Sequence, residues 1–460
     1  MLRYLPGLAL LTLVVGLSAQ TWAQQVEVIT YTCRCVTGGV NQQTVQWLNE
    51  FVIPTFEERM AAAGRNVDVQ FTEFGGSDEA LKQQYALDLS VGRGFDVIAF
   101  DGFWVPEFAE AGLIKALDEI IGPEANEWEG WDHIAPSIQN LMGFGGKRYG
   151  IPVGTDVRMI FYNRELFVQA GIPQWWAWQP HSWEELLATA RQIKAALPDV
   201  IPLQINAGTS MGEATTLQGY YLVLLGTGEQ PYDFATNKWV VRSPGILRTL
   251  QFYKQIYIDE GLGDARTQLL SDARARTFQL FSEGKIAMLV EGDFFWRAVV
   301  SPTGSNAIPN RDTVVGWAAM PATAPGSGIR GQDFVTASGG TGNILNPNSA
   351  NPQLAWELLT FMNSQEGLNA AQQYQARIRA RDDVPVPNEA FLTVTARALL
   401  PFTTTRPGFP VYSQTVSPQI QLMTERVVSG EFSPREAMEA YALAVIDAVG
   451  IDDTEELPGF

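Results

Sequence analysis

The chain has 460 residues, of which 46% are hydrophobic, and a formal net charge of −19. A chain of this size and apolar content can bury a large core. Its acidity is spread along the sequence, which argues against nucleic acid or an anionic membrane surface as a partner. Alternatively, the negative charge only keeps the protein dispersed in solution and says nothing about a partner.

Residues 1–23 have the pattern of a signal peptide: a short basic start, an apolar run at 8–17 and small residues near 21–23. We therefore expect a mature protein that begins at Gln24 and is exported to the periplasm or another extracytoplasmic space. A retained anchor helix is the alternative, but the apolar run is shorter than the roughly 20 residues that a membrane span needs.

The two cysteines, Cys33 and Cys35, are separated by one residue. In an oxidising compartment they can form a disulfide, and two unreactive thiols are the alternative. A metal site needs more ligands than these. Only His133 and His181 add histidines, so the sequence predicts neither a metal site nor a cofactor.

Strands and helices alternate in the first hundred residues, judged from hydrophobic periodicity. The predicted order is a strand at 26–32, a helix at 41–63, a strand at 67–74, a helix that ends near 89 and a buried strand at 95–100. This βαβαβ order predicts an open α/β sheet, in which ligands bind beyond the carboxyl ends of the strands.

Asp101 and Trp104 follow the last of these strands. Carbohydrate recognition uses carboxylates for the hydroxyl groups and an aromatic face for the sugar ring, and these two residues supply both. The alternative is structural. Asp101 would then cap a helix that begins near Val105, and Trp104 would pack in the core.

An extended segment follows at 149–158, because Pro152 fixes its own backbone and lacks a donor. In an extended chain, Asp156 and Arg158 lie on the same face. We expect them at a ligand site; the alternative is a surface ion pair, which contributes little stability. The loop at 207–216 adds one weaker polar candidate, Glu213.

Two further motifs stand later in the chain. Residues 281–296, FSEGKIAMLVEGDFFW, predict a strand that ends at Asp293, Phe294 and Trp296. Residues 332–343 are rich in glycine, and Gly340 either lets backbone donors approach a ligand or only permits the turn. The chain has neither a dinucleotide-binding fingerprint nor a phosphate-binding loop.

In their order along the chain, these motifs resemble the family 1 extracellular solute-binding proteins, the carbohydrate-binding subunits of ABC importers related to maltose-binding protein. The likeness covers almost the whole mature chain. Its motifs are the strand-end Asp and Trp at 95–118, Y-G-I-P at 149–152, F-x-x-G-K-x-A-M at 281–288, the glycine crossing at 332–343, the A-W helix from 351 and the Arg-Asp-Val segment at 377–384.

The resemblance implies an α/β, two-lobed periplasmic-binding-protein fold of type II, with three interlobe crossings and a ligand cleft between the lobes. We expect residues 24–152 and 291–343 in the first lobe, including a strand at 314–320. Residues 153–290 and 344–460 would then form the second lobe, with a helix-rich C-terminus.

The resemblance also implies ligand-binding roles for eleven residues: Asp101, Trp104, Asp156, Arg158, Asp293, Phe294, Trp296, Gly340, Thr341, Arg381 and Tyr412. Phe294 stands at the family's stacking position, so either it or Trp296 would stack on the sugar. Thr341 replaces a family tryptophan. Arg381 would reach the ligand or serve as a structural arginine, and Tyr412 would close the cleft.

The implied function is binding of a mono- to trisaccharide, without catalysis and as a monomer, and its delivery to a membrane permease. A polyol or another small polar solute is an alternative ligand. A secreted glycoside hydrolase is the enzymatic alternative, since it too needs two carboxylates in a cleft. An anionic ligand would call for a basic cluster, and the sequence reveals only Arg158 and Arg381 near the expected site.

Overall fold

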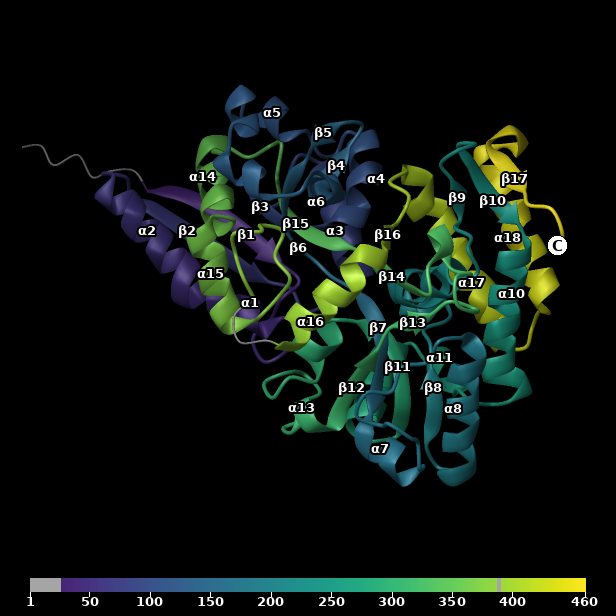
Figure 1. The fold of residues 1–460 in the computed structure, drawn as a ribbon. Coiled ribbons are helices and arrows are strands. Elements are labelled where there is room, and N and C mark those ends of the chain that lie inside the picture. The colour runs from purple at the N-terminus through teal and green to yellow at the C-terminus, as the bar shows by residue number, and fades with distance from the viewer. Residues whose placement is uncertain (1–25, 387–389) are drawn as a thin grey trace, which may run out of the picture.

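The computed structural model describes residues 26–460 except 387–389. The expected signal peptide therefore lies outside the described residues. The chain folds into two α/β lobes, each built around its own sheet, as Figure 1 shows. In the described residues, no helix is both long enough and apolar enough to cross a membrane.

The first lobe contains a five-stranded sheet in the order β2-β1-β3-β15-β6. Its strands are β1 (Glu27–Cys33), β2 (Val67–Glu73), β3 (Val97–Asp101), β6 (Gly150–Thr155) and β15 (Gly340–Leu345). β1 pairs in parallel with β2 and β3, whereas β15 is antiparallel to β3 and β6. The predicted βαβαβ unit is therefore confirmed.

Helices cover both faces of this sheet. They are α1 (Gln42–Trp47), α2 (Ile53–Ala62), α3 (Asp78–Ser90), α4 (Val105–Glu110), α5 (Leu117–Ile120), α6 (Pro136–Gln139), α14 (Pro352–Met362) and α15 (Gln365–Tyr374). Alternation along β3 explains the two layers, because Val97 packs in one hydrophobic core and Ile98 in the other. Ser77 starts α3 by accepting a hydrogen bond from the Ala80 N–H.

The second lobe contains a four-stranded sheet in the order β12-β7-β11-β8. Its strands are β7 (Arg158–Asn163), β8 (Ile201–Gln204), β11 (Ile286–Gly292) and β12 (Val315–Ala318). β7 is antiparallel to both of its neighbours, and β11 runs parallel to β8. Along β7, Met159 and Phe161 enter one core, and Ile160 and Tyr162 enter the other.

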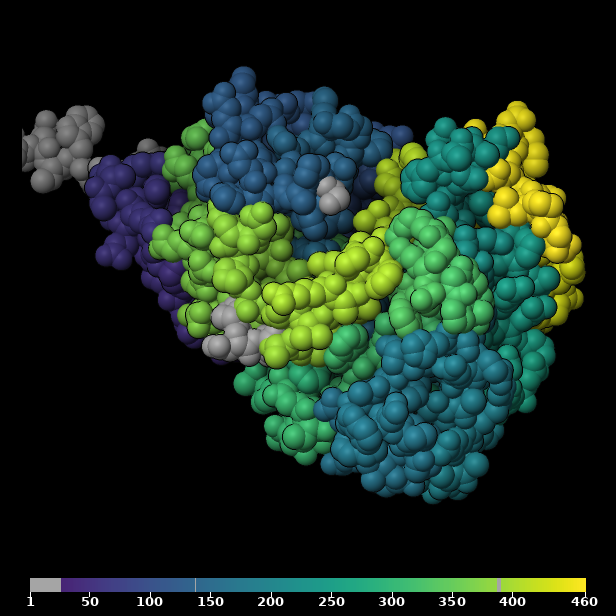
Figure 2. Space-filling model, viewed as in Figure 1, coloured from purple at the N-terminus to yellow at the C-terminus, as the bar shows by residue number. Residues whose placement is uncertain are grey.

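The remaining helices are α7 (Arg164–Gln169), α8 (Trp183–Ala196), α9 (Leu222–Leu225), α10 (Pro244–Lys254), α11 (Ala265–Gln268), α12 (Ala273–Ser282), α13 (Arg311–Val314), α16 (Ala390–Leu399), α17 (Ser417–Val428) and α18 (Pro434–Val449). The smaller strands are β4 (Gly143–Phe144), β5 (Lys147–Arg148), β9 (Tyr232–Asp233), β10 (Lys238–Arg242), β13 (Met320–Pro321), β14 (Phe334–Ser338), β16 (Thr403–Thr405) and β17 (Thr454–Glu456). In the space-filling view, the yellow-green α16 lies on the surface between the lobes (Figure 2).

Two segments belong to a different sheet or core than the sequence suggested. The strand expected in the first lobe at 314–320 is β12, which pairs with β7 of the second lobe. Helices α14 and α15, which we expected in the second lobe, pack in the same core as β1. Both segments follow a crossing, and the hydrophobic pattern of a strand or helix does not say which sheet it joins.

Three crossings connect the lobes and lie side by side. The first joins β6 to β7, the second joins β14 to β15, and the third is the extended segment 375–381. The Thr155 hydroxyl of the first donates to the Gly339 carbonyl of the second, at 3.1 Å. The third runs antiparallel to β6, since the Thr155 N–H donates to the Ile378 carbonyl at 3.1 Å and the Ala380 N–H to that of Val153 at 3.2 Å.

Candidate ligand-binding cleft

The two lobes touch across their junction. The Ser413 hydroxyl of the second lobe donates to the Glu107 carboxylate of α4 at 2.6 Å. The Phe103 ring, just after β3, packs edge-on against Tyr412 with a centroid distance of 5.6 Å. Beside these contacts is a cleft of about 1080 Å³, to which both lobes contribute; its lining includes Gly102, Phe103, Phe144, Phe234, Arg406 and Phe409.

Asp101 lies at the end of β3 and joins the two lobes electrostatically. Its carboxylate accepts the Phe103 N–H at 2.9 Å, so it caps the following turn as one interpretation predicted. It also pairs with Arg406 of the second lobe at 3.4 Å, and Arg406 donates to Glu213 at 2.8 Å. Burial raises the pKa of both carboxyl groups, against the opposing effect of Arg406.

Asp156 and Arg158 lie on the same face of the first crossing, as the extended backbone predicts. They form a buried ion pair, and the Gly339 N–H donates to Asp156 at 2.7 Å. Burial favours the neutral form of Asp156, but Arg158 and the Gly339 N–H together outweigh it and hold the pKa of Asp156 below its ordinary value. This pair therefore fastens the first crossing to the second.

Asp293 follows β11 and is 0% exposed. Neither of its carboxylate oxygens has a hydrogen-bond partner among the described residues, and the nearest guanidinium, that of Arg297, is 3.8 Å away. Burial, together with the charge of Asp156, raises the pKa of Asp293 to about 6. An unsatisfied buried carboxylate is costly, so this group is suited to bind a hydrogen-bond donor brought from outside.

The third crossing contributes two arginines that the sequence interpretation missed. Arg377 donates to the hydroxyl of the exposed Thr341 at 2.8 Å, and Arg379 donates to the Gln375 carbonyl at 3.2 Å. Burial and neighbouring arginines lower the pKa of Arg377 to about 10 and also lower that of Arg379. The signal was the alternation in RIRAR, which puts every second residue on one face of an extended segment.

Arg381, the arginine that we singled out in this segment, is already engaged. Its guanidinium donates to Asp383 at 2.8 and 2.9 Å and to Glu129 at 3.1 Å, and it lies over the Trp128 ring. These contacts fit the structural alternative, so we leave Arg381 out of the proposed site.

Phe294 is the half-buried aromatic residue at the end of β11, and the Arg274 guanidinium lies 5.1 Å from its ring centroid. Arg274 is in turn paired with Glu291 at 3.3 Å. Trp296 has a different environment, since it is 5% exposed and stacks on Phe391 at 4.2 Å. Of the two candidate stacking residues, Phe294 is therefore the one that retains an accessible ring.

Two other aromatic residues that we expected to contact the ligand, Trp104 and Tyr412, are packed inside the protein. Trp104 is 5% exposed and packs edge-on against Phe100 at 5.3 Å. Tyr412 is 0% exposed and lies between Phe103 and Trp239. We leave both out of the proposed ligand contacts, because neither offers a free ring face in this arrangement.

Gly340 lies at the start of β15, close to the end of β3. It is buried and lines the cleft, and a side chain there would meet Leu141 at 2.4 Å. This close approach accounts for a glycine at the crossing whether or not its backbone binds a ligand.

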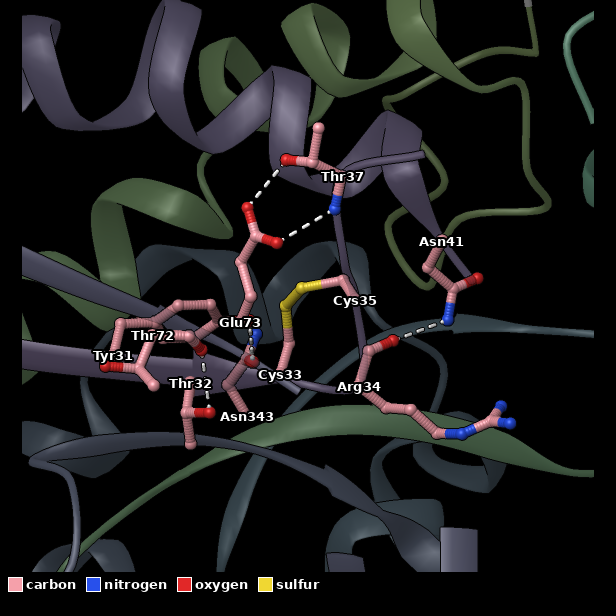
Figure 3. The surroundings of a disulfide bond; sticks show 10 residues. All are labelled: Tyr31, Thr32, Cys33, Arg34, Cys35, Thr37, Asn41, Thr72, Glu73 and Asn343. Atoms are coloured by element: carbon pink, nitrogen blue, oxygen red, sulfur yellow. Dashed lines mark hydrogen bonds between the residues drawn. A yellow bond between two sulfur atoms is a disulfide. The ribbon is translucent and has the colours of Figure 1, made fainter. Parts of the chain in front are cut away.

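Cys33 and Cys35 form a disulfide at the end of β1, one of the two alternatives that the sequence left open. Figure 3 shows the Arg34 side chain extending away from the bond. Its Nε donates to the Gly76 carbonyl at 2.8 Å, and a terminal nitrogen lies 3.4 Å from Asp78. The disulfide thus fixes the turn that carries Arg34 at this strand end.

The described residues also contain one group of potential metal ligands, although the sequence suggested none. His133, Asp382 and Asp383 bring one ligand atom each within 4.8 Å of one another. His133 already contacts Asp382 at 3.2 Å, and Asp383 accepts hydrogen bonds from Arg381. These contacts account for the grouping without an ion.

Comparison with known families decides the relationship. The family described as bacterial extracellular solute-binding protein matches residues 41–368. The chain belongs to this family. Curated relatives include a putative binding protein of Brucella abortus (strain 2308), which is 28% identical over 284 residues, or 62% of each chain. The chain thus spans less than two thirds of the length of that relative.

Solved structures share the fold of this solute-binding protein. A solute-binding protein of Thermotoga lettingae TMO bound with α-D-tagatose has a TM-score of 0.74 at 24% identity, with 92% of this chain and 99% of that chain covered. Maltose-bound MalE3 of T. maritima gives 0.75 at 18%, covering 92% and 100%. A ribitol complex from Agrobacterium radiobacter K84 gives 0.66 at 18%, covering 91% and 97%. The family and these neighbours are binding proteins rather than enzymes.

Proposed function

We propose that this protein is the extracytoplasmic substrate-binding component of an ABC sugar importer, and that it binds a mono- to trisaccharide between its lobes. The observation that carries the proposal is the convergence of charged side chains on the crossings. Asp101 from β3, Asp156 from the first crossing, Asp293 from β11 and Arg377 from the third crossing are close enough to shift one another's pKa values.

This set of side chains matches the chemistry of a sugar. Carboxylates accept hydrogen bonds from hydroxyl groups, and guanidinium groups donate to hydroxyl and ring oxygens. Phe294 supplies an aromatic face for the apolar side of a ring. Asp293 and Arg377 both have polar atoms without a hydrogen-bond partner among the described residues. A bound ligand would supply these missing hydrogen bonds.

The three adjacent crossings support a hinge. Two lobes that are joined by short extended segments can rotate about them, and the interlobe contacts of Ser413 with Glu107 and of Arg406 with Asp101 would form on closure. We propose that the protein acts as a monomer in the periplasm and passes its ligand to a membrane permease. From the sheet pairing, we propose lobe boundaries near 156, 339 and 380.

The proposal is tested by titration calorimetry with a panel of sugars and polyols, followed by product analysis of each mixture. We predict saturable binding of a sugar without turnover. Asp101→Asn and Phe294→Ala should each weaken binding about tenfold or more, because each removes a direct contact. Trp176→Ala, which alters an exposed aromatic residue on the second lobe, is the matched control and should bind as the wild type does.

The same experiment separates the alternatives. A polyol is the second candidate ligand, since one structural neighbour was solved with ribitol. Preference for polyols over every sugar would replace the proposed ligand class. Consumption of a sugar would contradict a pure binding function and favour a hydrolase that uses two of the clustered carboxylates.

A further inference from the structure

The junction where the three crossings meet is more basic than the sequence suggested. Guanidinium groups reach the crossings from three elements besides β7: Arg297 after β11, Arg377 and Arg379 on the third crossing, and Arg406 after β16. They act on one another electrostatically, since Arg297 is among the groups that lower the pKa of both Arg377 and Arg379. The protein as a whole carries a net charge of −19, so this local excess of positive charge needs an explanation.

The carboxylates near the crossings do not neutralise all of these arginines. Asp156 is paired with Arg158, and Asp101 shares Arg406 with Glu213. Asp293 is a further carboxylate at this junction, and it lies 3.8 Å from Arg297.

Arg377 and Arg379 therefore remain without an acidic partner. Neither makes a salt bridge within the described part of the chain, and the Nε atom of each is buried and unpartnered. Arg377 reaches forward to the hydroxyl of Thr341, an exposed residue on the second crossing. Its guanidinium is therefore held beside solvent-accessible space and retains donors for a ligand.

A second observation points the same way. The Arg297 side chain is 8% exposed, and its Nε has no hydrogen-bond partner in the described residues. Its Nη1 donates to Gln375, on the same segment as Arg377 and Arg379. Arg297 thus adds positive charge beside Arg377 and Arg379, although Asp293 lies near it. A buried guanidinium without an anion loses its hydration and gains little in return, so Arg377 and Arg379 together favour a negatively charged occupant.

We propose that the sugar bound between the lobes, where the crossings meet, carries a carboxylate, as a uronic acid does, and that Arg377 binds it, with Arg379 and Arg297 adding positive charge. This inference rests on the proposed carbohydrate-binding function and specifies the class of sugar. The planar guanidinium of arginine matches a carboxylate with two parallel hydrogen bonds, whereas neutral sugars offer no such group.

The experiment compares matched neutral and acidic sugars by calorimetry on the full-length mature protein. The pairs are glucose and glucuronate, galactose and galacturonate, and the dimers and trimers of galactose and of galacturonate. We expect the acidic member of at least one pair to bind about tenfold or more tightly than its neutral partner, which corresponds to a hydrogen-bonded charge pair.

Variants at Arg377 then test the contact itself. Arg377→Gln should weaken binding of both members of a pair but bring the ratio of acidic to neutral affinity to about one, because the charge-dependent contact to the carboxylate is lost. Arg377→Lys should retain part of the preference, since it keeps the charge but not the two-pronged geometry. Arg266→Gln, at a side chain that is 96% exposed, is the matched control and should preserve the preference. Near-ultraviolet circular dichroism checks that each variant is folded.

The outcomes separate this inference from the function on which it rests. If neutral sugars bind as tightly as their acidic partners, the inference is overturned and the sugar-binding function stands. A preference for acidic sugars that persists in a folded Arg377→Gln variant would also overturn it, because another group would then bind the carboxylate. If no sugar in the panel binds, the carbohydrate function fails and the inference fails with it.

Discussion

Asp293 combines complete burial with an unsatisfied carboxylate, at a point where the lobes meet. Charged groups in such positions are stable only when a partner or a proton compensates for the lost hydration. Arg297 is too distant for a hydrogen bond, so protonation is the compensation open to the protein without a ligand. Binding and titration at this residue are therefore expected to be linked.

We predict that Asp293 makes stability depend on pH. Its folded-state pKa of about 6 lies above the ordinary 3.8, so its contribution is fully present below pH 3.8 and is lost as the pH rises through about 6. Relative to Asp293→Asn, the wild type should lose about 2 kcal/mol of unfolding free energy between pH 4 and pH 7. Urea unfolding of both proteins at several pH values measures this. A constant difference across that range would contradict the assigned pKa.

The residues of the site were only partly predictable from the sequence. Asp101, Asp156 and Asp293 could be named because each ends a strand or follows a proline-fixed extended segment. Arg377 was missed because the family's Arg-Asp-Val motif points to Arg381. The pairing of the third crossing with β6 shows which arginine faces the other charges. Long-range pairing of this kind leaves no local signature.

At the scale of the elements, local periodicity predicted whether each segment is a helix or a strand, but not always which lobe or sheet it joins. The strands at 67–74 and 95–100 and the helix from Trp183 appear within two or three residues of their expected bounds. β12 was predicted as a strand but placed in the wrong lobe, because its partner β7 lies about 150 residues earlier. Periodicity indicates which face of a strand is buried, but it does not identify the strand that pairs with it.

The close packing of β6 against the third crossing gives a test at this scale. A side chain at Gly154 would meet the Ile378 carbonyl at 2.5 Å and the Arg377 Nε at 2.9 Å. We predict that Gly154→Ala lowers the unfolding free energy by about 1–3 kcal/mol, since the crossing must shift to accommodate the methyl group. Gly408→Ala is the control, because a side chain there has nothing within 4 Å. Equal stability of the two variants would show that the crossing is not packed as described.

At the scale of the whole molecule, two lobes with separate cores are held together by three adjacent crossings and by a few polar contacts. Phe103 links their hydrophobic cores, and Gln42 of α1 donates to the Thr303 carbonyl at 2.6 Å across the junction. Contacts of this kind are few enough to break and re-form, which suits a protein that must release its ligand.

The central claim is that the ligand lies between the lobes, where the crossings meet, and it is tested most directly by hydrogen–deuterium exchange with and without the tightest-binding sugar from the calorimetric panel. We predict that a saturating ligand slows exchange of backbone amides in both lobes at 101–104, 155–158, 292–296, 338–341 and 377–380, because closure shields them from water. Exchange around the exposed Trp176 should not change. Protection confined to one lobe, or found only away from the crossings, would contradict the account.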